Sequence, residues 1–423
     1  MAGWKVLVVG GGSREHAFVW KLSQSPRVGK IFCAPGNGGT AALAENVPIA
    51  VNQVADLARW AATNEIDLVI VGPEEPLALG LVDRLQELGI PAFGPGAAAA
   101  QLESSKSWAK QVMVDAGVPT AAYRVFEQAD AAWDYARTQR YPLVLKADGL
   151  AAGKGVLIAN NLDEARAAIA TVLVDQTFGA AGQKLVVEEF LSGNEVSLIA
   201  FVDGRTTVPL VPSCDHKRIG DGDTGANTGG MGAYAPTRLV NPALLDQLRA
   251  EILDPVVAQL SHRGLPYRGA LYAGLMLTAA GPRVIEFNCR FGDPETQVIL
   301  PLLDGDFAEI AYATATGVLN PASVQVGPGH RCGVVVASGG YPGPYAVGRE
   351  IRGLEQLDPR ALAFHAGTRR VDDTLVTSGG RVLTVVGEGE SLAAARQHAY
   401  DNVARIAFGD IYYRRDIGWR EPG

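Results

Sequence analysis

The chain has 423 residues, a length typical of about three domains rather than one. Hydrophobic residues make up 48% and charged residues 19%, so the chain can bury several cores and a disordered role is excluded. The formal net charge is −8 and no dense run of Lys or Arg occurs, which argues against nucleic acid as a partner.

Cysteine spacing and the N-terminus indicate the compartment. The four cysteines are scattered without a C-x-x-C pair, so neither a disulfide framework nor a zinc site is predicted. Trp4-Lys5 runs directly into a strand instead of an apolar leader, and no stretch reaches ~18 apolar residues. We therefore expect a cytoplasmic protein that does not associate with membranes.

The N-terminal third alternates between strand and helix patterns. Residues 6–9 form an apolar, β-branched run that ends at a glycine turn, and residues 15–22 have helical spacing. Further strands are expected at 31–33, 47–49, 68–71 and 91–93, with helices at 54–64 and 77–89. This alternation predicts a parallel sheet with helices on both faces.

The turn Gly10-Gly11-Gly12-Ser13 does not fit a dinucleotide site. That fingerprint needs a third glycine where this chain has Glu15, and no acidic residue follows Cys33 at the expected distance. A glycine turn at a helix N-terminus still presents N–H groups to an anion. A substrate phosphate and a turn without any ligand both remain open.

The middle of the chain predicts a compact α+β unit that binds phosphates. A helix over 104–117 leads to strands at 123–126, 142–146, 156–159 and 185–189, with helices at 129–138 and 162–174. Residues 146–155 are rich in Gly and Ala, but Gly155 stands where a Walker loop needs Ser or Thr. The alternative to a phosphate lid is a surface loop without a ligand.

Lysine is scarce, and its placement favours the phosphate lid. Lys106, Lys146 and Lys154 fall in or beside the candidate phosphate segments, although chance placement is the alternative. Backbone groups of Glu188, Glu189, Phe190 and Leu191 are candidates for reading an adenine edge. The Glu195 carboxylate is a candidate for both ribose hydroxyls.

A short strand carries candidate metal ligands. Glu286 and Asn288 lie two residues apart in 284–288, so they project from one face and offer oxygen ligands to a hard cation. Arg290 follows directly and suits an oxyanion or a transferred phosphoryl group. An edge strand with a solvated polar face is the alternative.

A long polar loop spans 215–232. Its composition is too polar for a buried core and favours an ordered substrate-binding loop over a linker.

These residues together resemble the phosphoribosylamine-glycine ligase family (glycinamide ribonucleotide synthetases) of the ATP-grasp superfamily, from end to end of the chain. The segments that carry the resemblance are Gly12-Ser13-Arg14-Glu15-His16, Ala34-Pro35-Gly36-Asn37, Val71-Gly72-Pro73-Glu74, 146–155, Asp215-His216-Lys217-Arg218, 227–234, 286–297 and Ser338-Gly339-Gly340-Tyr341-Pro342. Departures are small: Ser13, Cys214 and Ala226 stand where the family commonly has other residues.

The resemblance implies an α/β and α+β multidomain fold. An N-terminal parallel-sheet (pre-ATP-grasp) domain would span 1–102 and bind substrate. A central ATP-grasp domain would span 103–326, with a mobile lid subdomain over about 123–192, and a small C-terminal α/β domain would span 330–423. The implied reaction joins glycine to 5-phosphoribosylamine at the expense of ATP and gives glycinamide ribonucleotide, ADP and phosphate through a glycyl phosphate, in purine biosynthesis.

The resemblance also implies residue roles. ATP binding falls to Lys106, Lys146, Gly149, Gly153, Lys154, Gly155, Glu188, Glu189, Phe190, Leu191 and Glu195. Substrate binding falls to Gly11, Gly12, Ser13, Arg14, Glu15, His16, Asp215, Lys217, Asn227, Gly229 and Gly230. Arg290 and Asp293 are the catalytic residues. Glu286 and Asn288 would hold Mg²⁺ or Mn²⁺ without a third protein ligand, because 271–277 contains no carboxylate.

Two rival functions stay open from the sequence. One is another ATP-grasp carboxylate-amine ligase, against which the segments 215–218 and 227–232 speak. The other is a non-catalytic nucleotide-binding regulator on the same scaffold. The presence of Glu286, Asn288 and Arg290 together argues against it. We expect a monomer that acts on small molecules.

Overall fold

The computed structural model describes residues 3–151 and 155–421. The N-terminal region is the expected parallel sheet, with strand order β3-β2-β1-β4-β5. Its strands are β1 (Trp4–Gly10), β2 (Val28–Pro35), β3 (Glu45–Asn46), β4 (Leu68–Val71) and β5 (Ala92–Phe93). Its helices are α1 (Ser13–Leu22), α2 (Val54–Thr63), α3 (Glu74–Ala78) and α4 (Leu81–Glu87).

Two helices differ from the sequence prediction. The helix expected over 77–89 begins earlier and is interrupted, because Gly80 takes the left-handed conformation (φ 79°) between α3 and α4. The helix expected over 104–117 is α6 (Lys106–Asp115). It follows a separate α5 (Ala97–Ser104), because Ser105 is extended and its hydroxyl accepts the Trp108 N–H as an N-cap.

The central region contains two antiparallel sheets. The larger has the order β11-β10-β16-β17, and the smaller has the order β6-β9-β7-β8. The larger consists of β10 (Asn194–Asp203), β11 (Thr207–Pro209), β16 (Arg268–Thr278) and β17 (Gly281–Asn288), with α9 (Pro242–Leu248) and α10 (Asp254–His262) following in sequence after β11. The smaller consists of β6 (Tyr123–Phe126), β7 (Leu143–Ala147), β8 (Val156–Ala159) and β9 (Leu185–Glu189), with α7 (Ala129–Ala136) and α8 (Leu162–Ile169).

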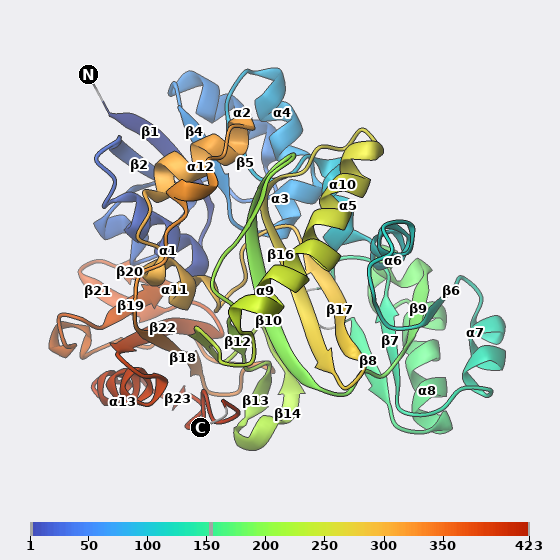
Figure 1. The fold of residues 1–423 in the computed structure, drawn as a ribbon. Coiled ribbons are helices and arrows are strands. Elements are labelled where there is room, and N and C mark those ends of the chain that lie inside the picture. Colours follow the sequence, from blue (N-terminus) through green and yellow to red (C-terminus); the bar gives the residue numbers. More distant parts are fainter. Residues whose placement is uncertain (1–2, 152–154, 422–423) are drawn as a thin grey trace.

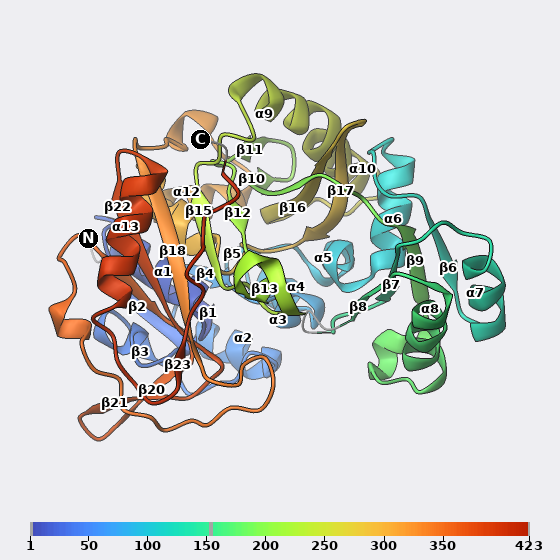
Figure 2. The same ribbon diagram turned by 90° about the horizontal axis from the view of Figure 1, so that it is seen from below.

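The smaller sheet and its helices form a separate lobe. Their buried residues, such as Leu145, Val187 and Ile169, make a core of their own. Figures 1 and 2 both place this lobe at one end of the molecule, away from the N-terminal sheet. The lobe covers most of the stretch for which a lid subdomain was predicted.

The C-terminal region is built on an antiparallel sheet whose order is β12-β15-β18-β22-β19, with β23 paired to β18. Its strands are β12 (Cys214–Asp215), β15 (Gly232–Ala235), β18 (His330–Ser338), β19 (Leu362–His365), β22 (Arg381–Gly389) and β23 (Ile411–Tyr412), and α13 (Leu392–Val403) packs on them. The strands β12 and β15 precede residue 326, so the polar loop between them is fixed at both ends to the C-terminal sheet. Figure 2 shows β12, β13 and β15 beside β18.

The N-terminal and central sheets share two hydrophobic cores. Leu7 and Leu198 belong to one core, whereas their neighbours Val8 and Ile199 belong to the other. Because successive strand residues point to opposite faces, both sheets are buried on two sides, which for the parallel N-terminal sheet is the expected arrangement. The shared cores hold the N-terminal glycine turn against the central domain.

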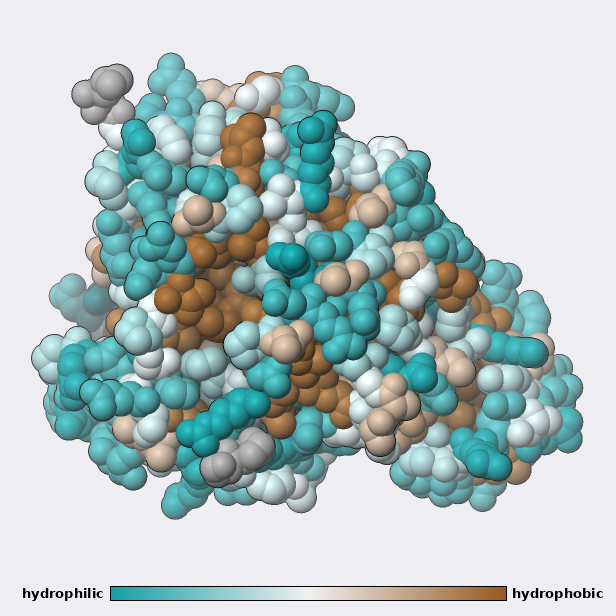
Figure 3. All heavy atoms as spheres, viewed as in Figure 1, coloured by the Kyte–Doolittle hydropathy of each residue, from teal (hydrophilic) through white to brown (hydrophobic). Residues whose placement is uncertain are grey.

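The remaining connections of the described chain complete the framework. They include β13 (Arg218–Gly220), β14 (Thr224–Asn227), α11 (Thr296–Ile299), α12 (Phe307–Thr316), β20 (Thr368–Val371) and β21 (Thr374–Thr377). In Figure 3, apolar side chains gather in the middle of the visible face, around α11, α12 and β10, whereas the outer edges are mainly hydrophilic. Within the described residues, we find no helix that is both long and apolar enough to cross a membrane.

Candidate functional site

Two adjoining cavities lie where the three regions meet. The smaller has a volume of about 410 Å³ and is lined by residues from all three regions, among them Arg14, Glu74, Lys106 and Arg381. The larger has a volume of about 710 Å³ and lies along the lobe and the polar loop, next to residues 188–193 and Lys217. Glu286, Asn288, Arg290 and Asp293 line both. The end of β17 therefore stands between two binding spaces.

The strand β17 presents Glu286 and Asn288 as the sequence predicted. Ile285 is skipped in the pairing with β16, and from Glu286 onward the strand alternates between cavity and core, with Phe287 buried. Burial opposes ionisation of Glu286, but Lys217, Lys146, Lys106 and Arg290 outweigh it and lower the pKa of the carboxyl. A carboxylate that stays ionised among cations suits a metal only when further anionic ligands, such as phosphates, are present.

Arg290 is held from several sides. Its Nε donates to Glu74 Oε2 at 3.3 Å, and its Nη2 lies 3.0 Å from Glu103 Oε1. Its Nη1 donates to the Phe291 carbonyl at 3.2 Å. Burial lowers the pKa of Arg290, but these carboxylates outweigh it and keep the guanidinium charged.

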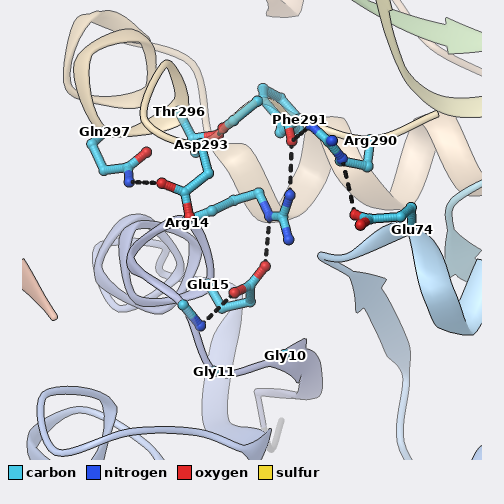
Figure 4. Close-up of polar contacts among 12 residues, drawn as sticks. Gly10, Gly11, Arg14, Glu15, Glu74, Arg290, Phe291, Asp293, Thr296 and Gln297 are labelled. Carbon is cyan, nitrogen blue, oxygen red and sulfur yellow. Dashed lines mark hydrogen bonds and ion pairs between the residues drawn. The ribbon is translucent and has the colours of Figure 1, made fainter. Parts of the chain in front are cut away.

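Asp293 connects the central domain to the C-terminal region. Its Oδ1 accepts from Gln297 Nε2 at 2.7 Å and lies 3.3 Å from Arg381 Nη1, and Figure 4 shows the Gln297 contact. Burial would raise the pKa of Asp293, yet Arg381 and Arg14 lower it. Arg381 Nη1 also donates to the carbonyls of Gly229 (2.8 Å) and Asp293 (2.9 Å). One residue of β22 thus joins the end of the polar loop to the segment after β17.

The glycine turn lies directly against this segment. Arg14 Nη1 donates to the Phe291 carbonyl at 3.1 Å, and a Cβ at Gly12 would lie 3.4 Å from Asp293 Oδ2. Glu15 is buried, and it accepts from the Gly12 N–H and from Arg14 Nε, both at 2.6 Å (Figure 4). Glu15 therefore shapes the turn and orients Arg14.

The other predicted residues of the turn do not line either cavity. A Cβ on Gly11 would lie 2.7 Å from the Gly36 carbonyl, which explains why a glycine is needed there. Ser13 Oγ donates to the Phe364 carbonyl, and His16 Nδ1 accepts from the His365 N–H at 2.8 Å. These side chains join the N-terminal helix to the C-terminal region, and of residues 11–16 Arg14 is the one that lines either of the two cavities.

The lysines are gathered around one carboxylate. Glu188 Oε2 lies 3.0 Å from Lys146 Nζ and 3.2 Å from Lys110 Nζ. All three side chains are at most 4% exposed. Lys106 donates to the Gly149 carbonyl at 2.8 Å, and burial lowers its pKa. Glu188 thus contributes a charged side chain, in addition to the backbone groups predicted to read adenine.

Sequence reasoning missed Lys110. It lies four residues after Lys106 on α6, hence on the same helix face, and it lines the smaller cavity. In a chain with so few lysines, this i, i+4 spacing was the signal that could have found it. Glu74, Glu103 and Arg381 were also missed. Glu74 stands in the quoted segment 71–74 but was given no role, and no local pattern marks the other two, because their partner Arg290 or Asp293 is at least 88 residues away in sequence.

Two further segments were predicted to bind nucleotide. They are the lid loop over 146–155 and the chain that leaves the lobe over 188–195, which we call the hinge. Gly149 and Gly155 line the smaller cavity, whereas Gly153 and Lys154 lie outside the described residues. Glu189, Phe190, Leu191 and Glu195 line the larger cavity. Glu189 accepts the Ala122 N–H at 2.9 Å, and Glu195 forms an ion pair with Lys217.

The polar loop contributes Asp215, Lys217, Asn227 and Gly229 to the larger cavity. Burial raises the pKa of Asp215, and Lys217 acts in the opposite direction. Gly230 does not line the larger cavity. Its positive φ of 111° and the nearby Pro294 both require a glycine at this position. The C-terminal tail fixes the loop, since the fully buried Arg414 contacts Asp223 Oδ1 (2.9 Å) and the Arg218 carbonyl (3.0 Å).

The donor set at β17 fits a hard divalent cation in part. Glu286 and Asn288 supply one carboxylate and one amide oxygen, and the described residues hold no cluster of three or more His, Cys, Asp or Glu side chains able to bind a metal by itself. Such a pair is typical of a magnesium site that is completed by phosphates and water.

Comparison with known proteins agrees with this architecture. Three family models match: phosphoribosylglycinamide synthetase N domain at residues 4–103, ATP-grasp (A) domain at 104–296 and C domain at 331–420. The chain is 51% identical to the phosphoribosylamine–glycine ligase of Nostoc sp. over 98% of this chain and 99% of that protein, and 49% identical to that of Pseudomonas aeruginosa over 98% and 97%.

Solved structures give the same result. The crystal structure of phosphoribosylamine–glycine ligase from Thermotoga maritima superimposes with a TM-score of 0.87 at 34% identity, covering 98% of this chain and all of that one. A biotin carboxylase domain from Hydrogenobacter thermophilus has the same fold, with a TM-score of 0.76 at 16% identity and coverage of 98% and 92%. Matches to all three domain models, in order, and half-identity over nearly the full length leave one assignment: the chain belongs to the phosphoribosylglycinamide synthetase family.

Proposed function

We propose that this chain is an ATP-dependent carbon-nitrogen ligase that joins glycine to 5-phosphoribosylamine in purine biosynthesis, giving glycinamide ribonucleotide, ADP and phosphate. The observation that carries the proposal is the shared wall of the two cavities. Glu286, Asn288 and Arg290 face both, so a nucleotide in one cavity and a carboxylate in the other would meet at the end of β17. The relatives named phosphoribosylamine–glycine ligase supply the substrates.

In this proposal the adenosine lies in the larger cavity, and the phosphates extend along the shared wall into the smaller cavity, which Lys106, Gly149 and Gly155 line. Backbone groups of Glu188, Glu189, Phe190 and Leu191 read the adenine, and Glu195 accepts the ribose hydroxyls. Lys106, Lys146, Gly149, Gly153, Lys154 and Gly155 bind the phosphates. The buried ammonium groups support this role, because desolvated cations attract phosphate oxygens more strongly than exposed ones.

Glu286 and Asn288 would hold Mg²⁺ or Mn²⁺ between them and the phosphates. A metal bound there would neutralise charge on the phosphates during transfer. Arg290 donates to the oxygens that become more negative, and Asp293 is a second candidate catalytic residue beside it. The cations around Glu286 keep its carboxylate ionised, as a metal ligand must be.

The two substrates lie around the end of β17 in this proposal, next to the glycine turn at the smaller cavity and the polar loop at the larger one. Gly11, Gly12, Ser13, Arg14, Glu15 and His16 form the phosphoribosyl side, and Asp215, Lys217, Asn227, Gly229 and Gly230 form the polar-loop side. Because Ser13, Glu15 and His16 face protein partners, their part in substrate binding would be to hold the Gly12 backbone and Arg14 in place.

Chemistry in this site needs an activated carboxylate, because a carboxylate by itself does not acylate an amine. A glycine oxygen attacks the γ-phosphorus of ATP and ADP leaves, which gives glycyl phosphate. The amine of phosphoribosylamine then attacks the carbonyl carbon, and phosphate leaves with the bridging oxygen. Enclosure by the lid would protect the acyl phosphate from water.

The domain limits 1–102, 103–326 and 330–423, with a lid over about 123–192, belong to the same proposal. The family matches support them, and the separate core of the lobe supports the lid. We further propose that the protein works as a monomer in the cytoplasm. Sedimentation of the purified chain tests the oligomeric state.

The test uses glycine labelled with ¹⁸O in both carboxylate oxygens. Together with ATP, Mg²⁺ and freshly made phosphoribosylamine, we expect each phosphate released to carry one ¹⁸O. ADP release should require glycine and should fall strongly when the amine is omitted. Formation of the amide with unlabelled phosphate would refute the acyl phosphate, and ADP release that is independent of glycine would refute the proposed ligase.

A further inference from the structure

Glu103 is a buried carboxylate that contacts two consecutive residues of the site. Its Oε2 accepts the Cys289 N–H at 2.7 Å, and its Oε1 lies 3.0 Å from Arg290 Nη2. The side chain is only 8% exposed. One carboxylate therefore holds both the backbone where β17 ends and the guanidinium that follows it.

The position of Glu103 in its helix is unfavourable by local rules. It lies in the last turn of α5, where the unpaired carbonyls make the helix end negative, and burial of a carboxylate adds a desolvation cost. Packing does not require a charge there, since the neighbours Ala99, Ala100 and Leu102 are apolar and buried. Such local conflicts are typical of functional sites. Here the compensation comes from Arg290.

The contacts of Arg290 show what Glu103 achieves. Nε donates to Glu74, Nη2 lies against Glu103 and 3.4 Å from Asn288 Oδ1, and one Nη1–H donates to the Phe291 carbonyl. Among the described residues, the second Nη1–H has no partner, and the side chain lines both cavities. The two carboxylates thus hold the planar guanidinium in place and leave the second Nη1–H for a ligand.

We propose that Glu103 is a positioning residue for Arg290, which it holds so that the remaining Nη1–H meets an oxygen of the reacting phosphoryl or carboxyl group. The inference rests on the proposed function for the identity of that ligand. Glu74 is the second carboxylate that contacts Arg290. It belongs to the N-terminal domain, so the orientation of the guanidinium also depends on how that domain packs against the central one. Glu103 belongs to the same region as Arg290 and sets its orientation more directly.

The test compares Glu103→Gln with wild type. Gln keeps the size of the side chain and an acceptor for the Cys289 N–H but removes the charge that faces Arg290. We expect kcat to fall about 10- to 100-fold, as for a misplaced catalytic group, whereas the Kd for ADP with Mg²⁺ and the melting temperature change little. Glu309→Gln removes an exposed carboxylate that pairs with Arg27, and as the matched control it should retain wild-type kcat.

Two further variants separate positioning from general structure. Glu103→Asp keeps the charge and should retain more kcat than Glu103→Gln. In an Arg290→Lys background, adding Glu103→Gln should lower kcat by less than about threefold, because the two residues act as a unit. A kcat of Glu103→Gln within threefold of wild type would overturn the inference. So would a decrease in kcat that is as large in the Arg290→Lys background as in the wild-type background.

A crystal structure of Glu103→Gln gives a readout that does not depend on turnover. We expect the Arg290 guanidinium to leave the position it has beside Asn288, and an unmoved guanidinium would overturn the inference. If the wild type releases no ADP with glycine and phosphoribosylamine, the proposed function fails. The position of Arg290 still decides the role of Glu103 in that case.

Discussion

Lys110 and Lys146 approach the same oxygen of the Glu188 carboxylate, at 3.2 and 3.0 Å. They come from α6 and from β7 in the lobe, so the shared carboxylate joins the lid to the central domain. Glu188 Oε1 is buried and has no hydrogen-bond partner in the described chain. The cluster has two basic side chains against one acidic side chain at the wall of the smaller cavity, which favours an anion there.

Lys110→Met should weaken nucleotide binding. Without Lys110, the Glu188 charge is balanced by Lys146 alone, and Lys146 becomes less available to a phosphate. We expect the Kd for ADP with Mg²⁺ to rise about tenfold or more, which corresponds to one charged hydrogen bond, measured by calorimetry. Lys184→Met removes an exposed lysine of the lobe that lines neither cavity and should leave the Kd unchanged. An unchanged Kd in Lys110→Met would exclude this role.

Glu286→Gln should abolish most turnover but not nucleotide binding. The carboxylate is replaced by a neutral amide of the same shape, so the metal loses its only charged protein ligand in the proposed site. We expect kcat to fall about 10²-fold or more, as for other preorganised electrostatic groups. The measurement is steady-state ADP release over a range of Mg²⁺ concentrations. Turnover within threefold of wild type at limiting Mg²⁺ would show that the metal assignment is wrong.

Buried histidines should make the protein less stable in acid. Burial lowers the pKa of His16 to about 3, and the pKa values of His216 and His365 to about 4. Below pH 6.5 the unfolded chain therefore binds protons that the folded chain does not, so the free energy of unfolding falls as the pH falls. Between pH 7 and pH 5 each histidine contributes a loss of about 2 kcal/mol.

The variant His16→Asn tests this pH dependence. Asn can still accept the His365 N–H but does not titrate, so urea unfolding at pH 7 and pH 5 should differ less than in wild type by about 2 kcal/mol. The exposed His262→Asn serves as the control and should keep the wild-type difference. A pH dependence unaltered by His16→Asn would mean that His16 does not remain neutral in the fold.

Nucleotide should protect the hinge of the lobe from hydrogen exchange. The lobe has its own core, and its polar links to the central domain include Lys110–Glu188 and Lys106 to the Gly149 carbonyl. Because the proposed nucleotide lies between lobe and polar loop, we expect slower exchange at 185–191 and 149–151 with ATP and Mg²⁺. Peptides from α13 should not change. Equal exchange in both states would remove the case for a closing lid.

Residue type and local spacing were enough to predict the family and most of the local structure. The apolar run before the glycine turn, the spacing of Glu286 and Asn288 and the strand over 185–189 each depend on residues close together in the chain, so periodicity and residue type suffice to predict them. Glu15 in place of the third glycine was equally decisive, and the structure adds that its carboxylate caps the Gly12 N–H.

Tertiary structure alone decided which distant groups support the site. Glu103 and Arg381 hold Arg290 and Asp293 across long stretches of sequence, and β12 and β15 leave the central region to extend the C-terminal sheet. The local sequence around a carboxylate at a helix end, or around an arginine on a strand, does not predict which residue it will pair with. Its role arises only when packing brings two charges together and removes water from both, because desolvation is what makes the partner obligatory.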